Sequence, residues 1–269
     1  MTDRNDGSTR RSRRCALVTG ASAGIGQAFA ERLAADGFDL VLVARSRERL
    51  DALAQRLSAE RGVRVEVLAA DLTDAAERGL VERAIAEREL DLLVNNAGFG
   101  TFGPFAESDP GAEEREIQLN VVAVSRLTRA ALPGMVARGA GGIINVSSMA
   151  AFSAAAYNAT YAATKAFVNS FTEALYEELK GTGVTVQALC PGFTRTEFQD
   201  RAGIEVDNVP AAAWMEASDV VDISLAALQS RTLICVPGFS NRALAGFSSV
   251  LPRGWSRRLV ATLARQMLH

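Results

Sequence analysis

The sequence predicts a single doubly wound α/β domain in which helices flank a seven-stranded parallel sheet. Short β-prone runs alternate with longer stretches of helical periodicity along the 269 residues. The apolar runs do not alternate strictly with polar residues, which is typical of strands buried on both faces beneath crossover helices. Neither an internal repeat nor a linker divides this pattern, so we expect one domain.

Seven apolar runs are predicted as strands. They are CALVT (15–19), DLVLVA (39–44), VRVEVLA (63–69), DLLVNN (91–96), GIINVS (142–147), VTVQALC (184–190) and TLICVP (232–237). Stretches rich in Ala, Glu, Arg and Leu are predicted as the helices between them. They cover residues 25–36, 47–61, 74–88, 113–138, 158–180 and 218–230. Strands joined by crossover helices give the doubly wound arrangement.

The catalytic domain is expected over residues 15–238. Residues 1–14 carry five arginines and lack the apolar stretch of a signal peptide, so we expect a disordered basic N-terminus. Residues 239–269 are predicted to form a basic amphipathic tail. From Ile223 onward there are six arginines and no acidic residue, so the net charge of −2 combines an acidic body of about −8 with a basic tail. No segment approaches the roughly eighteen apolar residues of a transmembrane helix.

The residue counts restrict the chemistry. The single histidine, His269, is the last residue, which argues against Ser-His-Asp and Cys-His catalysis and against His/Cys metal sites, so we predict no metal. Three scattered cysteines give no disulfide framework and fit a reducing cytosol. Lysine occurs only at Lys165 and Lys180, beside 27 arginines, so a lysine within a motif carries weight.

A glycine-rich turn, TGASAGIG (19–26), joins the first predicted strand to the first helix. Gly20 permits a sharp turn, while Gly24 and Gly26 let backbone and phosphate approach closely. The helix that follows presents unpaired N–H groups to a pyrophosphate. A plain strand-to-helix turn is the alternative, but the position at the first junction favours a dinucleotide site of Rossmann type.

Arg45 ends the second strand, where dinucleotide-binding folds select between cofactors. An acidic residue there holds the ribose 2′-hydroxyl of NAD, whereas arginine suits a 2′-phosphate, so we predict NADP(H). Ser46 and Arg47 could add contacts. Arg45 as a solvated strand-end residue is the alternative. Asp71, after the third strand, could accept the adenine amino group or cap a helix, for which Asp74 is an equally good candidate.

In NNAG (95–98), after the fourth strand, Asn95 could tie strands together. Ala97 and Gly98 leave room for a cofactor, although the segment on its own is an ordinary strand-to-loop turn.

The reaction site is predicted around Ser148, Tyr161 and Lys165. Tyr161 and Lys165 are four residues apart and share a helix face, while Ser148 follows the fifth strand at the carboxyl edge of the sheet. Ser148 can hydrogen-bond a substrate carbonyl. Ser147 is an alternative hydroxyl, and Tyr157 is expected as a neighbour of Tyr161 on the same helix.

Proton transfer by Tyr161 near neutral pH requires a lowered pKa. A shift of three units from about 10 corresponds to about 4 kcal/mol. One ammonium about 4 Å away supplies about 4 kcal/mol at an effective dielectric of about 20. We therefore expect Lys165, helped by an oxidised nicotinamide ring, to suffice.

The ordered set TGASAGIG, Asp71, NNAG, Asn120, Ser148, YAATK and PG (191–192) closely resembles the short-chain dehydrogenase/reductase family, from about Cys15 to Gly238. The resemblance implies that Tyr161 is the catalytic acid/base, Ser148 the carbonyl-orienting group and Lys165 both the pKa depressor and a ribose ligand. Asn120 would hold a water in a proton relay through Lys165. The cofactor contacts it implies are Gly20, Ser22, Gly24, Ile25, Gly26, Arg45, Asp71, Leu72, Asn96, Ala97, Gly98, Tyr161, Lys165, Pro191, Gly192, Thr194 and Thr196.

Residues 193–217 stand where this family has its substrate-binding loop. Their apolar members suit an apolar carbonyl substrate, or alternatively pack a lid onto the core; they are Phe193, Phe198, Val209, Trp214 and Met215. In the tail, Trp255 among arginines resembles an interfacial anchor, so tail contact with anionic lipid is one hypothesis. Packing of the tail on the body or on a partner subunit is the other.

These observations predict an NADP(H)-dependent short-chain carbonyl reductase or alcohol dehydrogenase in the cytoplasm, with a hypothesis of peripheral membrane contact. The alternative is a non-catalytic nucleotide-binding regulatory or scaffold protein of the same fold. The family commonly forms dimers or tetramers through helices corresponding to residues 113–138 and 158–180, so a homodimer or homotetramer is expected. No nucleic-acid partner is expected, because the body is acidic and shows no recognition motif.

Overall fold

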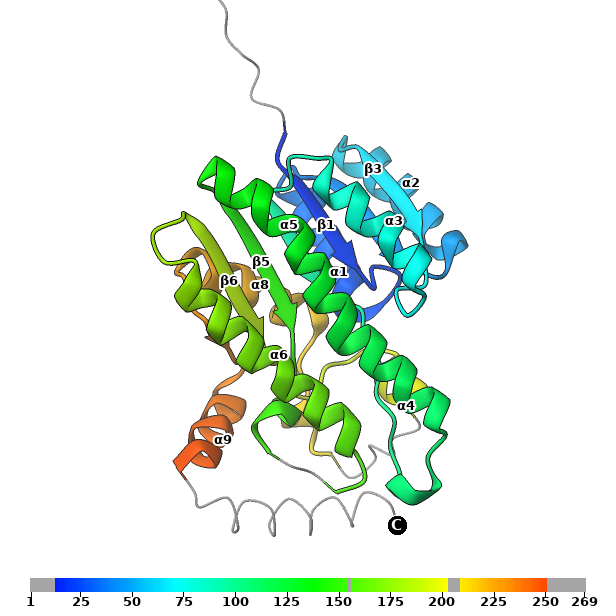
Figure 1. Cartoon of the computed structure of the whole chain (residues 1–269), viewed down its shortest axis with the longest axis vertical. Helices are drawn as coiled ribbons and strands as arrows, with labels where there is room; N and C mark the ends of the chain where they lie inside the picture. The colour runs from blue at the N-terminus through cyan, green and yellow to red at the C-terminus, as the bar shows by residue number, and fades with distance from the viewer. Residues whose placement is uncertain (1–12, 154–155, 203–208, 251–269) are drawn as a thin grey trace, which may run out of the picture.

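The parallel sheet predicted from the sequence is the centre of the molecule. The computed structural model describes residues 13–153, 156–202 and 209–250. The sheet has seven strands in the order β3-β2-β1-β4-β5-β6-β7, which confirms the predicted fold class (Figure 1). The strands are β1 (Cys15–Thr19), β2 (Asp39–Ala44), β3 (Val65–Ala69), β4 (Leu92–Asn95), β5 (Gly141–Val146), β6 (Val184–Leu189) and β7 (Ile234–Cys235). Each begins and ends within two residues of its predicted bounds.

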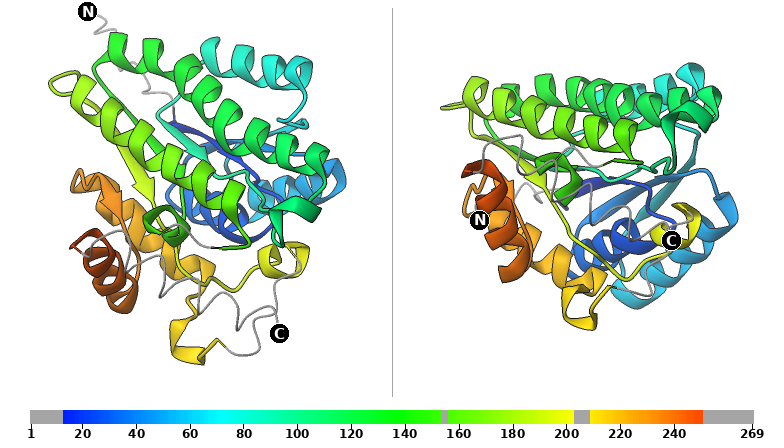
Figure 2. Two further views of the ribbon diagram at one scale, coloured as in Figure 1. Left: turned by 60° about the horizontal axis from the view of Figure 1, so that its bottom comes forward. Right: turned by 90° about the horizontal axis from the view of Figure 1, so that it is seen from below.

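The helices lie in two layers, one on each face of the sheet. They are α1 (Gly24–Ala35), α2 (Arg47–Arg61), α3 (Ala75–Ala86), α4 (Pro110–Ile117), α5 (Val124–Arg138), α6 (Ala159–Glu178), α7 (Phe198–Ala202), α8 (Ala217–Gln229) and α9 (Phe239–Val250). Helices α1, α2 and α8 cover one face, and α3, α5 and α6 cover the other (Figure 2).

Strand β1 shows why its apolar residues do not alternate with polar ones. Ala16 and Val18 belong to the hydrophobic core beneath α1, α2 and α8, whereas Leu17 belongs to the core beneath α3, α5 and α6. All three side chains are fully buried. A strand covered on both faces needs apolar residues at every position, as the sequence predicts.

The direction of chain progression through the sheet reverses between β1 and β4, which are neighbours and pair Val18 with Val94. In open parallel sheets, ligands bind at the carboxyl ends of the strands beside such a switch point. The segments that follow β1, β4 and β5 all begin at this edge. They contain the glycine turn, NNAG and Ser148.

The stretch predicted as a helix over residues 113–138 is helical throughout, but it is not one regular α-helix. It is divided into α4, a π-helical segment η2 (Gln118–Ala123) and α5. Helix α4 begins earlier than predicted, because Pro110 takes a position in its first turn and Asp109 caps it by accepting from Gly111 N and Ala112 N. The π-helical turn contains the fully buried Asn120. Such single turns often occur at functional sites.

Parts of the predicted termini and loop lie outside the described residues. Only residues 13–14 of the basic N-terminus are described, and the substrate loop over 193–217 is described except for residues 203–208. Of the tail over 239–269, the structure describes α9, where Phe239 and Leu244 are exposed, while Trp255 lies outside. None of the helices in the described ranges combines the length and the apolar character needed to cross a bilayer.

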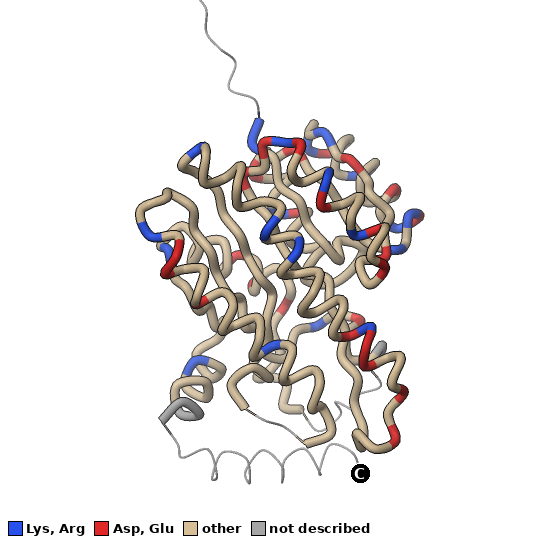
Figure 3. Tube along the Cα trace, viewed as in Figure 1, with Lys and Arg blue, Asp and Glu red and all other residues tan. Residues whose placement is uncertain are grey.

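Charged residues are unevenly distributed over the elements. Figure 3 shows them concentrated around α2 and α3 and sparse along the part of α6 and the loop near the carboxyl edge of the sheet. Between residues 139 and 172, Lys165 is the only charged residue. This stretch of the chain, which includes the loop after β5 and the first half of α6, is therefore apolar apart from one cation.

Candidate active site

The glycine turn after β1 forms a cradle that side chains would fill. Gly20 and Gly24 have φ angles of +66° and +56°, which glycine adopts without strain. A Cβ on Gly20 would lie 2.7 Å from Asn96 Nδ2, and a Cβ on Gly24 would lie 3.0 Å from the methyl group of Thr196. On Gly26 it would lie 2.3 Å from the Gly20 carbonyl oxygen, so packing within the turn by itself requires glycine at this position.

The N-terminus of α1 suits an anion. In the part of the chain that the structure describes, Ala23 caps α1 without a side-chain hydrogen bond, and no acidic residue lies in its first turn. Ser46, Asp74 and Asp109 cap α2, α3 and α4 with side-chain oxygens. Helices α6 and α8 also lack a side-chain cap, but α1 begins directly after the glycine turn. Its first N–H groups therefore fit a pyrophosphate bound in that turn. Ser22 and Ile25, predicted cofactor contacts, lie half-buried in this turn.

Asn96 stabilises the glycine turn through hydrogen bonds to Thr19. Its Nδ2 donates to the carbonyl oxygen of Thr19 at 2.9 Å, and its backbone N–H donates to Thr19 Oγ1 at 2.9 Å. The Ala97 N–H donates to the same hydroxyl at 3.0 Å. The side chain of Asn96, predicted as a cofactor contact, is therefore occupied in joining the segment after β4 to the turn after β1.

Asn95 ties strands together, as the sequence predicts. Its Nδ2 donates to Asn145 Oδ1 in β5 at 2.9 Å and to Thr128 Oγ1 in α5 at 3.0 Å. Asn145 in turn donates to Thr172 Oγ1 in α6 at 3.0 Å. This buried network fixes the ends of β4 and β5 relative to the two helices that cover them.

The residues predicted at the adenosine side of the cofactor occupy the ends of β2 and β3. Arg45 is exposed directly after β2, and Leu72 is buried after β3. Asp71 accepts from the N–H and the hydroxyl of Thr73 through one oxygen, Oδ1, at 2.9 and 2.8 Å. Since Asp74 caps α3, the capping role that was the alternative for Asp71 belongs to Asp74.

The two candidate serines separate by burial and by partner. The hydroxyl of Ser147 is buried and donates to the Lys165 carbonyl oxygen at 3.0 Å. Ser148 is half-buried at the start of the short 3-10 segment η3 (Met149–Phe152) and accepts from Ala150 N at 3.1 Å. A hydrogen bond with Ser148 also lowers the pKa of Tyr161. Ser148 is thus the hydroxyl that faces the tyrosine.

Tyr161 lies in the first turn of α6 between two phenylalanine rings. The ring centroids of Phe102 and Phe198 are each 5.7 Å from that of Tyr161, with interplanar angles of 44°. The expected neighbour Tyr157 is not on this helix, because α6 begins at Ala159 and Tyr157 has a left-handed φ of 67°. Its carbonyl oxygen accepts from Gly103 N at 2.8 Å, which joins the loop before α6 to the loop after β4.

Lys165 is buried one turn after Tyr161, and its Nζ donates to the Val146 carbonyl oxygen at 2.9 Å. The Nζ atom lies 5.6 Å from the centroid of the Tyr161 ring. A Cβ on Gly98 would lie 3.4 Å from this Nζ and 3.0 Å from Asn120 Oδ1, so the glycine admits both side chains.

The expected lowering of the Tyr161 pKa by Lys165 is not what the protein's own groups produce. Burial dominates and raises the pKa of Tyr161 to about 12, with the Ser148 hydrogen bond acting in the opposite direction and the Glu116 charge adding to the rise. Burial also lowers the pKa of Lys165 to about 8, against the charge of Glu116. The sequence-based expectation counted the attraction between the two groups and left out the cost of burying them. In this apolar site the loss of hydration outweighs the attraction.

Asn120 is positioned by the π-helical turn and holds the segment after β4. Its Nδ2 donates to the Phe99 carbonyl oxygen at 2.8 Å and to Thr164 Oγ1 at 3.1 Å, and its Oδ1 accepts from Phe99 N at 3.3 Å. Both amide hydrogens are thus used, while one lone pair of Oδ1 is left to accept from a water. That capacity fits the relay that the family resemblance implies.

The segment after β6 closes over the glycine turn. Pro191 is buried and accepts from Met149 N at 3.0 Å, and Gly192 packs against Asn241 of α9. Thr194 is buried and pairs with Met215 in a parallel bridge that closes the base of the substrate loop. The methyl group of Thr196 lies beside Gly24. Of the predicted lining residues, Thr196 is thus the one placed directly beside the glycine turn by a recorded contact.

The substrate loop is anchored by aromatic and ionic contacts. Phe193 and Trp214 lie with ring centroids 5.5 Å apart at its base, and Arg195 pairs with Glu216 at 3.0 Å. Glu197 forms an ion pair with Arg49 of α2 at 3.0 Å. Of the predicted apolar set, Phe198 alone is placed against Tyr161 by a ring contact recorded within the described residues.

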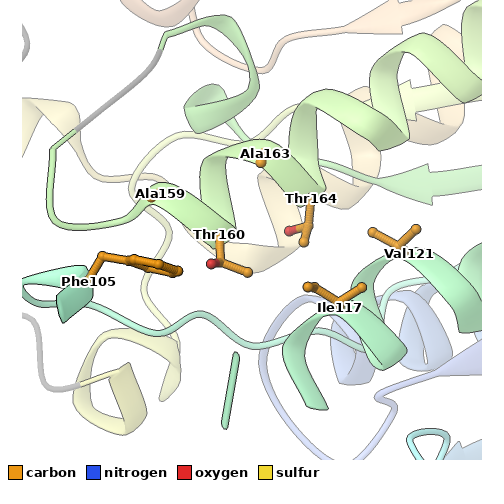
Figure 4. A pocket seen from close by; sticks show the side chains of 7 residues that line it. All are labelled: Phe105, Ile117, Val121, Ala159, Thr160, Ala163 and Thr164. Atoms are coloured by element: carbon orange, nitrogen blue, oxygen red, sulfur yellow. The ribbon is translucent and has the colours of Figure 1, made fainter. Parts of the chain in front are cut away.

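A separate apolar groove lies between α4, η2 and the start of α6 (Figure 4). It is lined by Phe105, Ile117, Val121, Ala159, Thr160, Ala163 and Thr164. Phe105 and Ile117 are 66% and 44% exposed, so the groove opens to the surface.

Three residues at the reaction site were not predicted. Gly100 and Phe102 contact Tyr161, and Glu116 is a fully buried carboxyl in α4. The sequence does offer a signal for Glu116. It precedes Asn120 by four residues, so on a helix the two side chains lie on the same face. Nothing in the sequence of GFGTF marks Gly100 or Phe102, because their contacts depend on the path of the loop.

Comparisons to known proteins agree with the fold. A family model described as short chain dehydrogenase matches residues 14–206, and the chain belongs to this family of oxidoreductases. The chain is 31% identical over 258 residues to a very-long-chain 3-oxoacyl-CoA reductase of Anas platyrhynchos, a match that covers 94% of this chain and 80% of that protein.

Solved structures show the same similarity. A short-chain dehydrogenase from Sphingobium yanoikuyae in complex with NADPH is 41% identical, with a TM-score of 0.81, and the match covers 89% of this chain and 96% of that one. A bulky-bulky ketone specific alcohol dehydrogenase from Comamonas testosteroni is 33% identical, with a TM-score of 0.76 and coverage of 89% and 95%. Related structures include complexes with NADPH and with NAD, which supports a nicotinamide cofactor.

Proposed function

We propose that this protein is an NADP(H)-dependent oxidoreductase that interconverts a carbonyl and a hydroxyl group on an apolar substrate. The observation that carries the proposal is the convergence of Ser148, Tyr161 and Lys165 at the sheet edge that also bears the glycine cradle. When bound, the nicotinamide ring supplies or accepts the hydride, and its oxidised form carries a positive charge. The cradle around Gly20 and the uncapped start of α1 fit the pyrophosphate.

The protein's own side chains bind the substrate oxygen and transfer the proton. The hydroxyl of Ser148 donates a hydrogen bond to the substrate carbonyl and orients it. Tyr161, whose pKa of about 12 keeps it protonated at neutral pH, donates its proton as the carbonyl oxygen gains negative charge. Lys165 stabilises the resulting tyrosinate, and Asn120 holds a water through which the proton is replaced.

The apolar substrate class is supported by the walls of the site. The rings of Phe102 and Phe198 flank Tyr161, and Lys165 is the only charged residue in the whole stretch 139–172. Beyond the oxygen atom that Ser148 and Tyr161 bind, a polar substrate would lose hydration against the two phenylalanine rings. The names of the relatives, an acyl-CoA reductase and a bulky ketone dehydrogenase, are consistent with an apolar or bulky carbonyl.

The test is a screen of acyl, steroid and sugar carbonyls that follows NADPH consumption by absorbance. Turnover of apolar ketones and not of sugars supports the proposal. A protein that binds NADPH and turns over none of these compounds would favour the alternative, a nucleotide-binding regulatory or scaffold protein.

Cofactor selection is proposed to depend on Arg45. Replacing Arg45 with Asp should lower kcat/KM for NADPH by about 10- to 100-fold, because a charge-assisted hydrogen bond of about 1.5–3 kcal/mol to the 2′-phosphate is lost. The value for NADH should not fall. Arg61→Asp, an exposed arginine at the other end of α2, is the matched control. An unchanged ratio of the two cofactors would show that Arg45 does not read the 2′-phosphate.

Assembly through α5 and α6 is proposed as the partner interaction. Val136 of α5 and Phe167 of α6 are 40% and 38% exposed, and Phe167 stacks on Phe171 at 5.6 Å. Exposed apolar residues on adjacent helices suit a symmetric contact between copies. Phe167→Glu should lower the mass measured by light scattering to that of the monomer, whereas a wild-type protein already monomeric at micromolar concentration contradicts the proposal.

The lipid hypothesis for the tail is tested by vesicle flotation. Phe239 and Leu244 of α9 are 81% and 58% exposed, which leaves apolar surface at the start of the tail. We expect the full chain to float with anionic vesicles and a chain without residues 240–269 to float less. Equal behaviour of the two chains would remove the hypothesis.

A further inference from the structure

Glu116 is a buried acidic residue to which the proposed reaction assigns no role. Its side chain is 0% exposed, although it lies in α4 only one turn before the π-helical segment. Its Oε2 accepts from the N–H and the hydroxyl of Thr101 at 2.8 and 2.7 Å. Its Oε1 is buried without a hydrogen-bond partner among the described residues. Burying a carboxyl oxygen without a hydrogen-bond partner lowers the stability of the fold. The presence of Glu116 here therefore calls for a functional explanation.

Glu116 and Asn120 hold the same loop at two points. The side chain of Asn120 bonds both the N–H and the carbonyl oxygen of Phe99, and that of Glu116 bonds Thr101 two residues further on. The two clamping residues are four apart and lie on successive turns of the same helix. Gly100 stands between the clamped residues, so its backbone is fixed on both sides.

The clamped backbone is the surface on which Tyr161 rests. A Cβ on Gly100 would lie 2.8 Å from Cδ2 and 3.0 Å from Cγ of the Tyr161 ring. The next ring, that of Phe102, follows directly after Thr101 and contacts Tyr161 at 5.7 Å between centroids. Displacement of Thr101 would therefore displace both groups that pack on the reacting tyrosine.

Two glutamates of α4 lie against the hydroxyl of Thr101. The hydroxyl of Thr101 lies 2.7 Å from Glu116 Oε2 and 2.8 Å from Glu113 Oε1. The hydroxyl of Thr101 is thus within donating distance of both carboxyl groups, which places Thr101 at the point where the loop meets α4. Burial and the Glu113 charge raise the pKa of Glu116, while Thr101 and Lys165 act in the opposite direction.

We propose that Glu116 is a positioning residue for the reaction, which holds the 98–102 segment against the ring of Tyr161 by binding Thr101. The proposal rests on the proposed function, in which Tyr161 transfers the proton.

Substitution of Glu116 by leucine or by glutamine distinguishes the hydrogen bonds to Thr101 from the space that the side chain fills. Glu116→Leu removes the acceptor and should lower kcat for carbonyl reduction by about 10- to 100-fold with KM for NADPH unchanged, because small misplacement of a reacting group costs about that much. Glu116→Gln keeps an acceptor for Thr101 and should retain kcat within about 3-fold. Glu114→Leu, an exposed glutamate on the same helix, is the matched control. A kcat for Glu116→Leu within 3-fold of wild type would overturn the proposal.

A double-mutant cycle tests whether the effect passes through Thr101. Thr101→Val removes the bridging hydroxyl and should lower kcat, and adding it to Glu116→Leu should lower kcat no further. Strict additivity of the two effects would contradict the clamp. Should Glu116→Leu fail to fold, Thr101→Val decides, since an unchanged kcat there also overturns the proposal.

Tyrosine NMR provides a readout that does not depend on turnover. With [13Cζ]-tyrosine, the Tyr161 resonance among the three tyrosines is identified by its loss in Tyr161→Phe. We expect it to shift or broaden in Glu116→Leu and to remain in place in Glu114→Leu and Glu116→Gln. An unmoved resonance in Glu116→Leu refutes the clamp, whereas a moved resonance in a protein without carbonyl turnover refutes only the proposed function.

Discussion

Replacing Tyr161 with Phe should reduce carbonyl reduction by about 10²- to 10⁴-fold, the range typical for loss of a positioned general acid. The ring stays between Phe102 and Phe198, so only the hydroxyl that faces Ser148 is removed. Binding of NADPH, measured by fluorescence titration, should change by less than about 3-fold. The rate is measured from NADPH absorbance with whichever ketone the screen identifies.

Tyr176→Phe is the matched control for this substitution. Tyr176 lies near the other end of α6, partly buried against the core beneath α3 and α5 and away from the glycine turn. Its loss of a hydroxyl should leave the rate of reduction unchanged. If Tyr161→Phe retained more than a tenth of the wild-type rate, the proton would have to come from another group.

The pH dependence of the two reaction directions follows from the same residue. Because burial raises the pKa of Tyr161 to about 12, the protein's own groups keep the proton on the hydroxyl that reduction requires. Alcohol oxidation requires the deprotonated form, so its rate should rise with pH while the rate of reduction falls at high pH. The positive charge of oxidised nicotinamide favours that deprotonation.

The strands could be predicted closely because their signal is local. Ala16, Leu17 and Val18 are all buried, and a short unbroken apolar run of this kind predicts a strand covered on both faces. The division of 113–138 into α4, η2 and α5 could not be predicted, because QLNVVA has ordinary helical periodicity. The π-turn there follows from tertiary contacts, with Asn120 bonded to Phe99 and Thr164.

The site divides in the same way. Ser148, Tyr161 and Lys165 could be predicted because their spacing and the rarity of lysine are visible in the sequence. The direction in which the pKa of Tyr161 shifts could not be predicted, because it depends on how completely the side chain is buried. Gly100 belongs to the unpredicted part for a similar reason: its contact with Tyr161 is made by a loop whose course is set elsewhere, at Glu116 and Asn120.

Replacing Lys165 with Met should separate activity from stability. The rate of reduction should fall by about 10²- to 10³-fold, since the ammonium that stabilises the tyrosinate is lost and a preorganised charge is worth about 3–4 kcal/mol in such a site. Stability at pH 7 should not fall and should rise by about 1–3 kcal/mol, because a buried cation is replaced by an apolar side chain of similar length. The lost hydrogen bond to Val146 offsets part of the gain.

The stability effect of Lys165→Met should have a defined pH window. The pKa of Lys165 is lowered from 10.5 to about 8, so between these values the unfolded chain binds the additional proton. Wild-type stability therefore rises with pH across this window as the burial penalty disappears, and the advantage of the variant shrinks. Denaturant unfolding at pH 7 and pH 10 measures the difference.

Lys180→Met is the natural control, since Lys180 is the other lysine of the chain and forms an exposed pair with Glu177. It should alter neither the rate nor the pH dependence of stability. A Lys165→Met protein that is less stable than wild type at pH 7 by more than about 2 kcal/mol would mean that the hydrogen bond to Val146 matters more than the burial of charge. Lys165 would then be a structural residue of the β5–α6 junction in addition to its role at the tyrosine.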